Sequence, residues 1–146
     1  MNAALAKGHI ALAPAEWERG RYLLNCFMDD LIDTPSSNRC EQLAPPDHTL
    51  REAAHLLTAH HQAWTGIGKW LPRRLLSADP ARGRSLLDGH QLVAERGHPA
   101  SLAAAAEQVL DLVGGSLREG YIQRQPERTR LSAPTRMTPP LSWRPR

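Results

Sequence analysis

The sequence predicts an all-α fold, and three observations support this prediction. Apolar residues recur at helical spacing, for example at Leu24, Phe27, Met28 and Leu31. Proline, glycine and N-capping residues divide the chain into pieces of helical length. No run of alternating β-branched residues indicates a strand. We therefore expect a bundle of five to six helices, followed by a disordered tail rich in proline and arginine.

Two helices are expected in the first half of the chain. After a flexible N-terminus at residues 1–14, the apolar spacing predicts a helix over Ala15–Asp33. Thr49 and Glu52 have the spacing of a capping box, in which each side chain accepts a hydrogen bond from the other residue's backbone N–H. A second helix is therefore expected over Leu50–Trp64.

Three or four further helices are expected after a glycine-containing loop. A short helix is predicted over Leu71–Ser77. Asp79 is a favourable N-cap in front of a proline, so the next helix is predicted from there to Arg96. An alanine-rich helix is predicted over Pro99–Val113, and a last short turn of helix over Ser116–Gln123.

The charge of the chain is unevenly distributed. The whole chain of 146 residues has a formal charge of +3, and residues 124–146 contain six Arg and one Glu, so this tail carries +5 and residues 1–123 carry −2. Such a tail cannot bury enough apolar surface to offset its loss of entropy on ordering. We expect one domain over residues 15–123 and a solvated tail that makes at most weak contact with nucleic acid.

Composition also excludes several classes of protein. Two cysteines are too few for a disulfide framework and fit a cytoplasmic protein. No stretch of about 18 apolar residues is present, so no membrane contact is expected. Metal-binding patterns such as HExxH and CxxC are absent, and no metal site is predicted.

The segment from Trp64 to Pro72 is the main candidate for a binding site. It combines two tryptophans, two glycines and Lys69. In one interpretation Lys69 pairs with a phosphate while Trp70 or Trp64 stacks on a base or sugar. In the other, Trp70 fills the core and Lys69 is solvated. The sequence favours neither.

Two other pairs of residues are candidates for chemistry. Asp29 and Asp30, at the end of the first helix, can hold a cation or a hydroxylated, amino-bearing substrate. Arg84 and His90 match the loose R-x(4–6)-H pattern of HEPN-type ribonucleases, in which Arg and His assist acid–base cleavage of a phosphodiester. Ser85 follows the Arg, where that family has Asn or Asp.

Three short motifs resemble the helical C-terminal region of bacterial nucleotidyltransferase-domain proteins, in the polymerase-β-like superfamily that includes aminoglycoside nucleotidyltransferases. They are Arg21-Tyr22-Leu23-Leu24 leading into Asp29-Asp30-Leu31, then Gly68-Lys69-Trp70-Leu71, and then Val109-Leu110-Asp111 through Gly120-Tyr121. The resemblance covers residues 15–123. It implies that Lys69 and Trp70 lie near an acceptor pocket and that Asp29 and Asp30 lie near its rim.

The chain departs from this family in lacking its catalytic half. The family's glycine-serine turn is followed by an Asp-x-Asp pair that holds Mg²⁺, whereas no such pair follows Gly114-Gly115-Ser116 here. We therefore expect no catalysis by this chain alone, and no cofactor. Mg²⁺ and a nucleoside triphosphate enter only if a separate catalytic domain supplies their site. A truncated gene product would explain the departure.

The sequence therefore predicts a helical substrate- or partner-binding domain of the nucleotidyltransferase type. Its expected partners are a nucleotidyltransferase catalytic domain or a second copy of the chain. One alternative is a HEPN-like ribonuclease that uses Arg84 and His90. A second alternative is a small regulatory protein whose tail binds nucleic acid.

Overall fold

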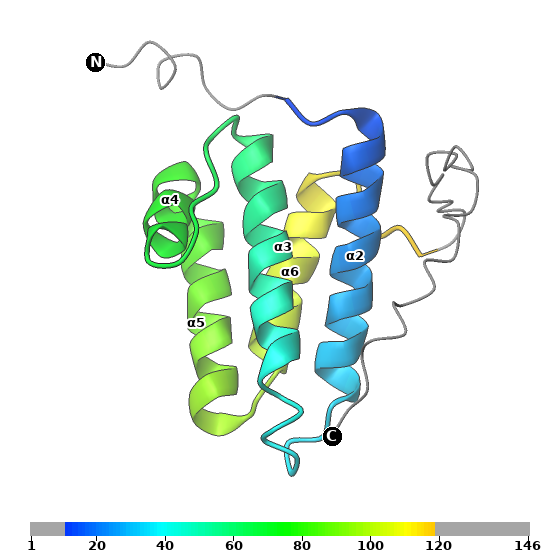
Figure 1. The fold of residues 1–146 in the computed structure, drawn as a ribbon, viewed down its shortest axis with the longest axis vertical. Helices are drawn as coiled ribbons and strands as arrows, with labels where there is room; N and C mark the ends of the chain where they lie inside the picture. The colour runs from blue at the N-terminus through cyan, green and yellow to red at the C-terminus, as the bar shows by residue number, and fades with distance from the viewer. Residues whose placement is uncertain (1–10, 119–146) are drawn as a thin grey trace, which may run out of the picture.

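The computed structural model describes residues 11–118, which form a bundle of five helices without a strand in that range (Figure 1). This confirms the predicted all-α class. The helices are α2 (Pro14–Asp33), α3 (Ala44–His60), α4 (Trp70–Ala78), α5 (Pro80–Arg96) and α6 (Ala100–Leu112). The predicted tail at 124–146 lies outside the described residues, as does the flexible N-terminus except for its last four residues. Within residues 11–118, no helix is long and apolar enough to cross a membrane.

The four longer helices alternate in direction, and the short α4 lies at one corner of the bundle (Figure 1). The closest packing joins α5 to α6 and α2 to α3. Since α2 and α3 are antiparallel neighbours, their connection at residues 34–43 lies at the opposite end of the bundle from the loop at residues 61–69, which leads into α4 (Figure 1).

The core consists of leucine, valine and alanine side chains from all five helices, together with Met28. Each fully buried leucine contributes about 2 kcal/mol through removal of its apolar surface from water. The largest fully buried apolar side chains are Leu24, Leu31, Leu56, Leu57, Leu75, Leu86, Leu102, Leu110, Val93 and Val109.

Helix ends follow the local signals at most positions. The Asp79 carboxylate caps α5 by accepting a hydrogen bond from the Arg82 N–H at 3.1 Å. Gly97 ends α5 with φ +69°, a left-handed conformation that glycine adopts at low cost. The predicted bounds of α2, α4, α5 and α6 therefore hold to within one or two residues. The expected last turn of helix is not present at residues 116–118, and its remainder lies outside the described range.

The predicted bounds of α3 are wrong at both ends. The helix begins six residues earlier, with Pro45 and Pro46 in its first turn. Proline is tolerated there because the N–H groups of the first turn have no hydrogen-bond partner within the helix. Thr49 is buried inside the helix and donates its hydroxyl hydrogen to the Pro45 carbonyl at 2.8 Å, so it forms no capping box with Glu52. The helix ends at His60, and Trp64 belongs to the following loop.

Candidate binding surface at the loop before α4

The loop between α3 and α4 is held in place from below by a buried threonine. Thr58 lies in the last turn of α3, and its hydroxyl group is 2.5 Å from that of Thr65 in the loop. The carbonyl of Thr58 also accepts a hydrogen bond from the Ala63 N–H at 2.8 Å. At Gly66 an added Cβ would lie 2.4 Å from the backbone of Trp70, so only glycine fits there. The loop is therefore a defined structure.

Three large apolar side chains of this segment are exposed. Ile67, between the two glycines, is 90% exposed, while Trp64 and Trp70 are 41% and 49% exposed. One interpretation of the sequence expected Trp70 to fill the core, and the exposure of its side chain shows that it does not. When a partner covers exposed Trp and Ile side chains, the removal of their apolar surface from water contributes favourably to the free energy of binding.

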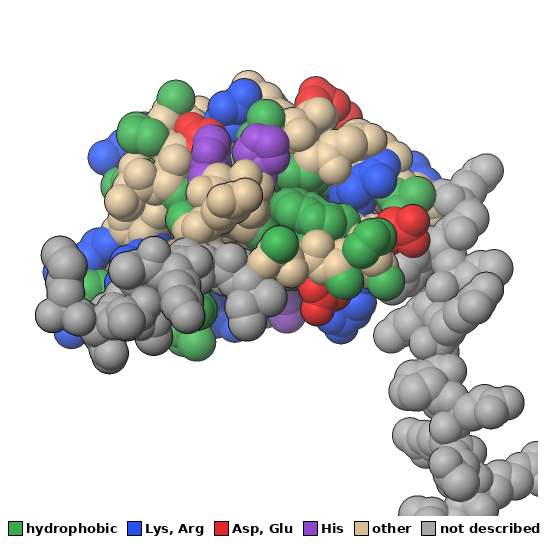
Figure 2. Space-filling view, turned by 90° about the horizontal axis from the view of Figure 1, so that it is seen from above, with side chains coloured by type: hydrophobic (Ala, Val, Ile, Leu, Met, Phe, Trp, Pro, Cys, Tyr) green, Lys and Arg blue, Asp and Glu red, His purple; other side chains and the backbone are tan. Residues whose placement is uncertain are grey.

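Basic side chains surround the ring of Trp70. The Lys69 ammonium lies 5.8 Å from the ring centroid, and the Arg73 guanidinium lies 5.0 Å from it, both within the range of a cation–π contact. We refer to Trp64, Ile67, Lys69, Trp70 and Arg73 as the basic surface. Figure 2 looks onto this end of the bundle, where histidine side chains lie beside hydrophobic and basic ones.

The charge of the basic surface is not cancelled by nearby sequence. Residues 53–78 contain Lys69, Arg73 and Arg74 but no Asp or Glu. The next acid in the chain, Asp79, is already engaged. Its side chain is only 8% exposed, and its Oδ2 atom lies 2.9 Å from Nε2 of His61 and 3.0 Å from Nη1 of Arg82. The α4 corner therefore presents a positive surface with a large apolar component.

Asp79 joins the loop to α5. Burial alone would raise the pKa of its carboxyl group, but hydrogen bonds from the Arg82 N–H, His61 and the Arg82 guanidinium outweigh that effect, and the pKa lies below its ordinary value. His61 is the C-cap residue of α3, so this cluster connects the end of α3 to the start of α5 beneath α4.

Asp29 and Asp30 lie far from the basic surface. They belong to the last turns of α2, at the opposite end of the bundle (Figure 1). Oδ2 of Asp29 accepts a hydrogen bond from the Arg118 guanidinium at 2.7 Å, and Asp30 is exposed. The structure therefore brings Lys69, Trp70 and Trp64 together but does not add the two aspartates to the same site.

Arg84 and His90 share α5 but do not converge. Six residues at about 100° per residue place their side chains about 120° apart around the helix. Nε2 of His90 lies 3.5 Å from Oδ1 of Asp47 on α3, whereas Arg84 is exposed. The structure therefore does not bring these two side chains together on a single copy of the chain.

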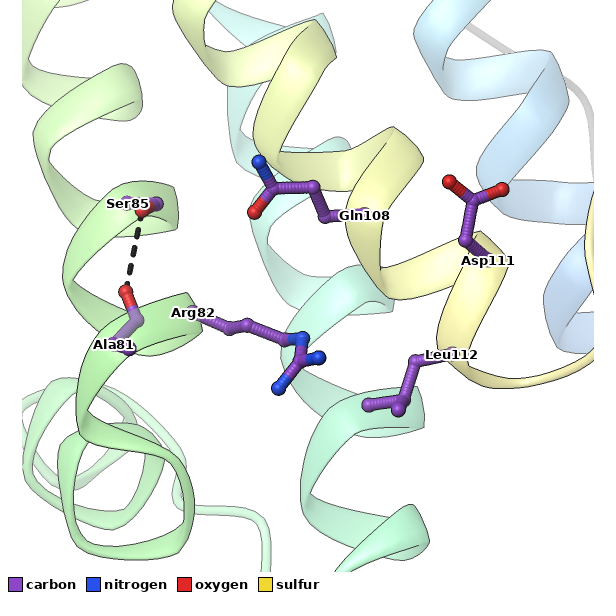
Figure 3. Close-up of a pocket in the computed structure, with 6 residues that line it drawn as sticks. All are labelled: Ala81, Arg82, Ser85, Gln108, Asp111 and Leu112. Carbon is purple, nitrogen blue, oxygen red and sulfur yellow. Dashed lines mark hydrogen bonds between the residues drawn. The ribbon is translucent and has the colours of Figure 1, made fainter.

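Two of the grooves on the bundle lie away from the basic surface. The larger, of about 610 Å³, separates α5 from α6, with Arg82 reaching from α5 and Gln108 from α6 (Figure 3). The lining residues Ser85 and Arg82 already bond to the Ala81 carbonyl and to Asp79, respectively. No residue of the basic surface lines this groove.

The smaller groove, of about 290 Å³, lies between α2 and α3 and is lined by Glu16, Arg19, Glu52 and His55, among others. Burial raises the pKa of the Glu52 carboxyl, and the charge of Arg19 offsets part of this effect. Within residues 11–118, no group of three or more His, Cys, Asp or Glu side chains is arranged to hold a metal ion.

Ile67, Arg73 and the cluster of His61, Asp79 and Arg82 are functional candidates that the sequence did not predict. An isoleucine between two glycines has no helix face on which to pack, which is a usable signal of exposure. By contrast, nothing in the sequence indicates that His61 meets an aspartate 18 residues later. Comparison with known proteins identified no matching family model, no similar curated protein and no similar solved structure.

Proposed function

We propose that this protein is a non-enzymatic helical binding module that contacts a protein partner through its basic surface. The observation that carries the proposal is the exposure of Ile67 (90%) between two half-exposed tryptophans, in a stretch without acidic residues. Leaving this apolar area in water is unfavourable, and a buried core of the bundle already exists without it.

The composition of the basic surface favours a protein partner. Tryptophan and arginine are the residues most enriched among the energetic hot spots of protein interfaces. The positive charge of Lys69, Arg73 and Arg74 favours an acidic partner through complementary electrostatic potential.

The resemblance to nucleotidyltransferases suggests one partner to test directly. A nucleotidyltransferase catalytic domain, supplied with Mg²⁺ and a nucleoside triphosphate, is the partner that the resemblance implies. Binding of an acceptor substrate by Lys69, Trp70 and Trp64 stays a prediction from the sequence, as does RNA cleavage by Arg84 and His90.

The proposed function is tested by affinity capture of the tagged full chain from the cells that produce it. Quantitative mass spectrometry then compares the wild type with Ile67→Ser and with the matched variant Ile67→Leu, which keeps an apolar side chain. We expect at least one protein to be enriched by the wild type and by Ile67→Leu, and to be lost in Ile67→Ser by tenfold or more. This loss corresponds to about 1.4 kcal/mol of binding free energy.

The second control is a substitution outside the basic surface. Arg51 is exposed on α3 and makes only an exposed pair with Asp47, so Arg51→Ser is expected to capture the same proteins as the wild type. The proposal is wrong if Ile67→Ser and the wild type enrich the same proteins to the same extent.

A further inference from the structure

A second surface of the molecule is complementary to the basic surface in charge. The connection between α2 and α3 carries exposed acidic and apolar side chains at the opposite end of the bundle (Figure 1). Ile32 is 58% exposed and Leu43 is 75% exposed. Asp30, Asp33 and Glu41 are exposed beside them in the sequence. We refer to these five residues as the acidic end.

The exposed large apolar side chains of residues 11–118 fall into these two groups alone. Ile32 and Leu43 belong to the acidic end, and Trp64, Ile67 and Trp70 belong to the basic surface. Apolar side chains are therefore exposed where acids gather and where bases gather. Each of the two segments has exposed apolar side chains beside charges mainly of one sign: residues 53–78 contain three bases and no acid, and residues 29–43 contain four acids and one base. An apolar centre with a polar rim is the usual composition of a protein interface.

Charge within the acidic end is not neutralised by its own segment. Residues 29–43 contain four acids and a single base, Arg39. The guanidinium of Arg39 donates to the carbonyls of Val93 and Ala94, at 3.1 and 2.6 Å, and keeps its positive charge, so residues 29–43 carry a net charge of −3. Arg118 pairs with Asp29, which leaves Asp30 and Asp33 exposed.

From this complementarity we propose that the partner of the basic surface is the acidic end of a second copy of this chain. The inference rests on the proposed function, because it uses the same surface. The contact joins two different surfaces, so it is heterologous. Each added copy leaves one free basic surface and one free acidic end, and association continues into rings or filaments.

Charge also favours a second copy over the chain's own tail as the partner of the basic surface. Residues 124–146 carry +5, the same sign as the basic surface, so they are not complementary to it. A second copy offers acidic and apolar groups together, as the basic surface requires.

Two charge reversals test the inference without weakening the helices that carry them. Lys69 is the N-cap residue of α4, and Asp33 is the last residue of α2. A carboxylate at a helix N-terminus and an ammonium group at a C-terminus both interact favourably with the helix dipole. Lys69→Glu and Asp33→Lys are therefore expected to fold at least as well as the wild type.

The experiment is sedimentation velocity of the full chain over a wide range of concentration, in low salt and at about 0.5 M salt, where charge pairs are screened. We expect the wild type to grow beyond a dimer as concentration rises, and to dissociate in high salt. Each variant alone is expected to bind itself at least tenfold more weakly. An equimolar mixture of the two is expected to associate more strongly than either variant alone, because it again contains one intact basic surface and one intact acidic end.

Three outcomes would overturn the inference. Self-association of Asp33→Lys at wild-type strength excludes the acidic end as the occupant and indicates a symmetric contact. A mixture that stays monomeric excludes the heterologous contact. A wild type that is monomeric at every concentration excludes a second copy altogether. This last result leaves the proposed function open to its own test, because capture of a different protein that depends on Ile67 would still support it.

Discussion

At the scale of single residues, Asp79 has the largest number of charged and polar contacts near the basic surface. Its carboxylate caps α5 through the Arg82 N–H and contacts His61 at the end of α3. The side chain is almost completely buried. The loop before α4 is thus held on the bundle by one carboxylate as well as by the contact between the hydroxyl groups of Thr58 and Thr65.

Replacement of Asp79 separates the capping contribution from the charge contribution. Asp79→Ala removes the cap and leaves His61 and Arg82 without their partner, so we expect a loss of about 1 to 3 kcal/mol in the free energy of unfolding. Asn is as good an N-cap as Asp, so Asp79→Asn is expected to lose less than half of that amount. Urea denaturation measures both values. Equal losses in the two variants would show that the cap contributes nothing.

Glu52 affects stability in the opposite direction. Burial raises the pKa of its carboxyl in the folded protein, so the charged form is less stable there than in the unfolded chain. This group therefore lowers stability at pH values above its folded pKa, and the effect disappears as pH falls below the unfolded value of about 4.3.

Glu52→Gln is accordingly expected to increase the free energy of unfolding at pH 7 and to leave it unchanged near pH 3. Urea denaturation at the two pH values measures the difference, with the exposed Glu18→Gln as the matched control. A decrease at pH 7 would show that the Glu52 carboxylate is stabilised by its attraction to Arg19 more than it is destabilised by burial.

At the scale of helices, local signals predicted the ends that depend on local contacts. Asp79 before Pro80 and the glycine after Arg96 fix the ends of α5 within a few residues, and the sequence shows both. The start of α3 was mispredicted because Thr49 has two alternatives. Its hydroxyl can cap a helix that begins there or bond to the Pro45 carbonyl inside a longer helix, and the structure contains the second.

The contact between α5 and α6 depends on a glycine. A Cβ at Gly89 would lie 2.7 Å from Cα and N of Leu102, so the two helices approach too closely for any side chain there. We expect Gly89→Ala to destabilise the protein by about 1 to 3 kcal/mol, because overpacking outweighs the gain of about 1 kcal/mol in helix propensity.

The control for this prediction is Ser85→Ala, an exposed change on the same helix that is expected to be neutral or slightly stabilising. Urea denaturation compares the two variants. If Gly89→Ala were as stable as Ser85→Ala, the helices would have room to separate and the close contact would not be required.

At the scale of the whole molecule, topology decides which predicted site residues meet. The sequence identified Lys69, Trp64 and Trp70 as a structured loop because their glycines and tryptophans are local signals. It could not show that Asp29 and Asp30 lie at the other end of the bundle, since that position depends on the antiparallel pairing of α2 and α3. The exposure of Ile32 and Leu43 is likewise a consequence of how the helices assemble.

The same topology gives the molecule two dissimilar ends. One carries the basic surface and the other the acidic end, and they are separated by the length of the helices (Figure 1). The α4 corner therefore carries three bases, Lys69, Arg73 and Arg74, although residues 1–123 carry a total charge of −2. We propose that the protein binds its partner through that corner.

Photo-cross-linking from position 67 tests this claim most directly. A benzophenone amino acid replaces Ile67 in the full chain, or Arg51 as the control, and irradiated cells are examined for adducts by mass spectrometry. We predict an adduct from position 67 that does not form from position 51. An adduct of two copies would support both proposals, and an adduct with another protein would support the binding function alone. The absence of any adduct specific to position 67 would contradict the account.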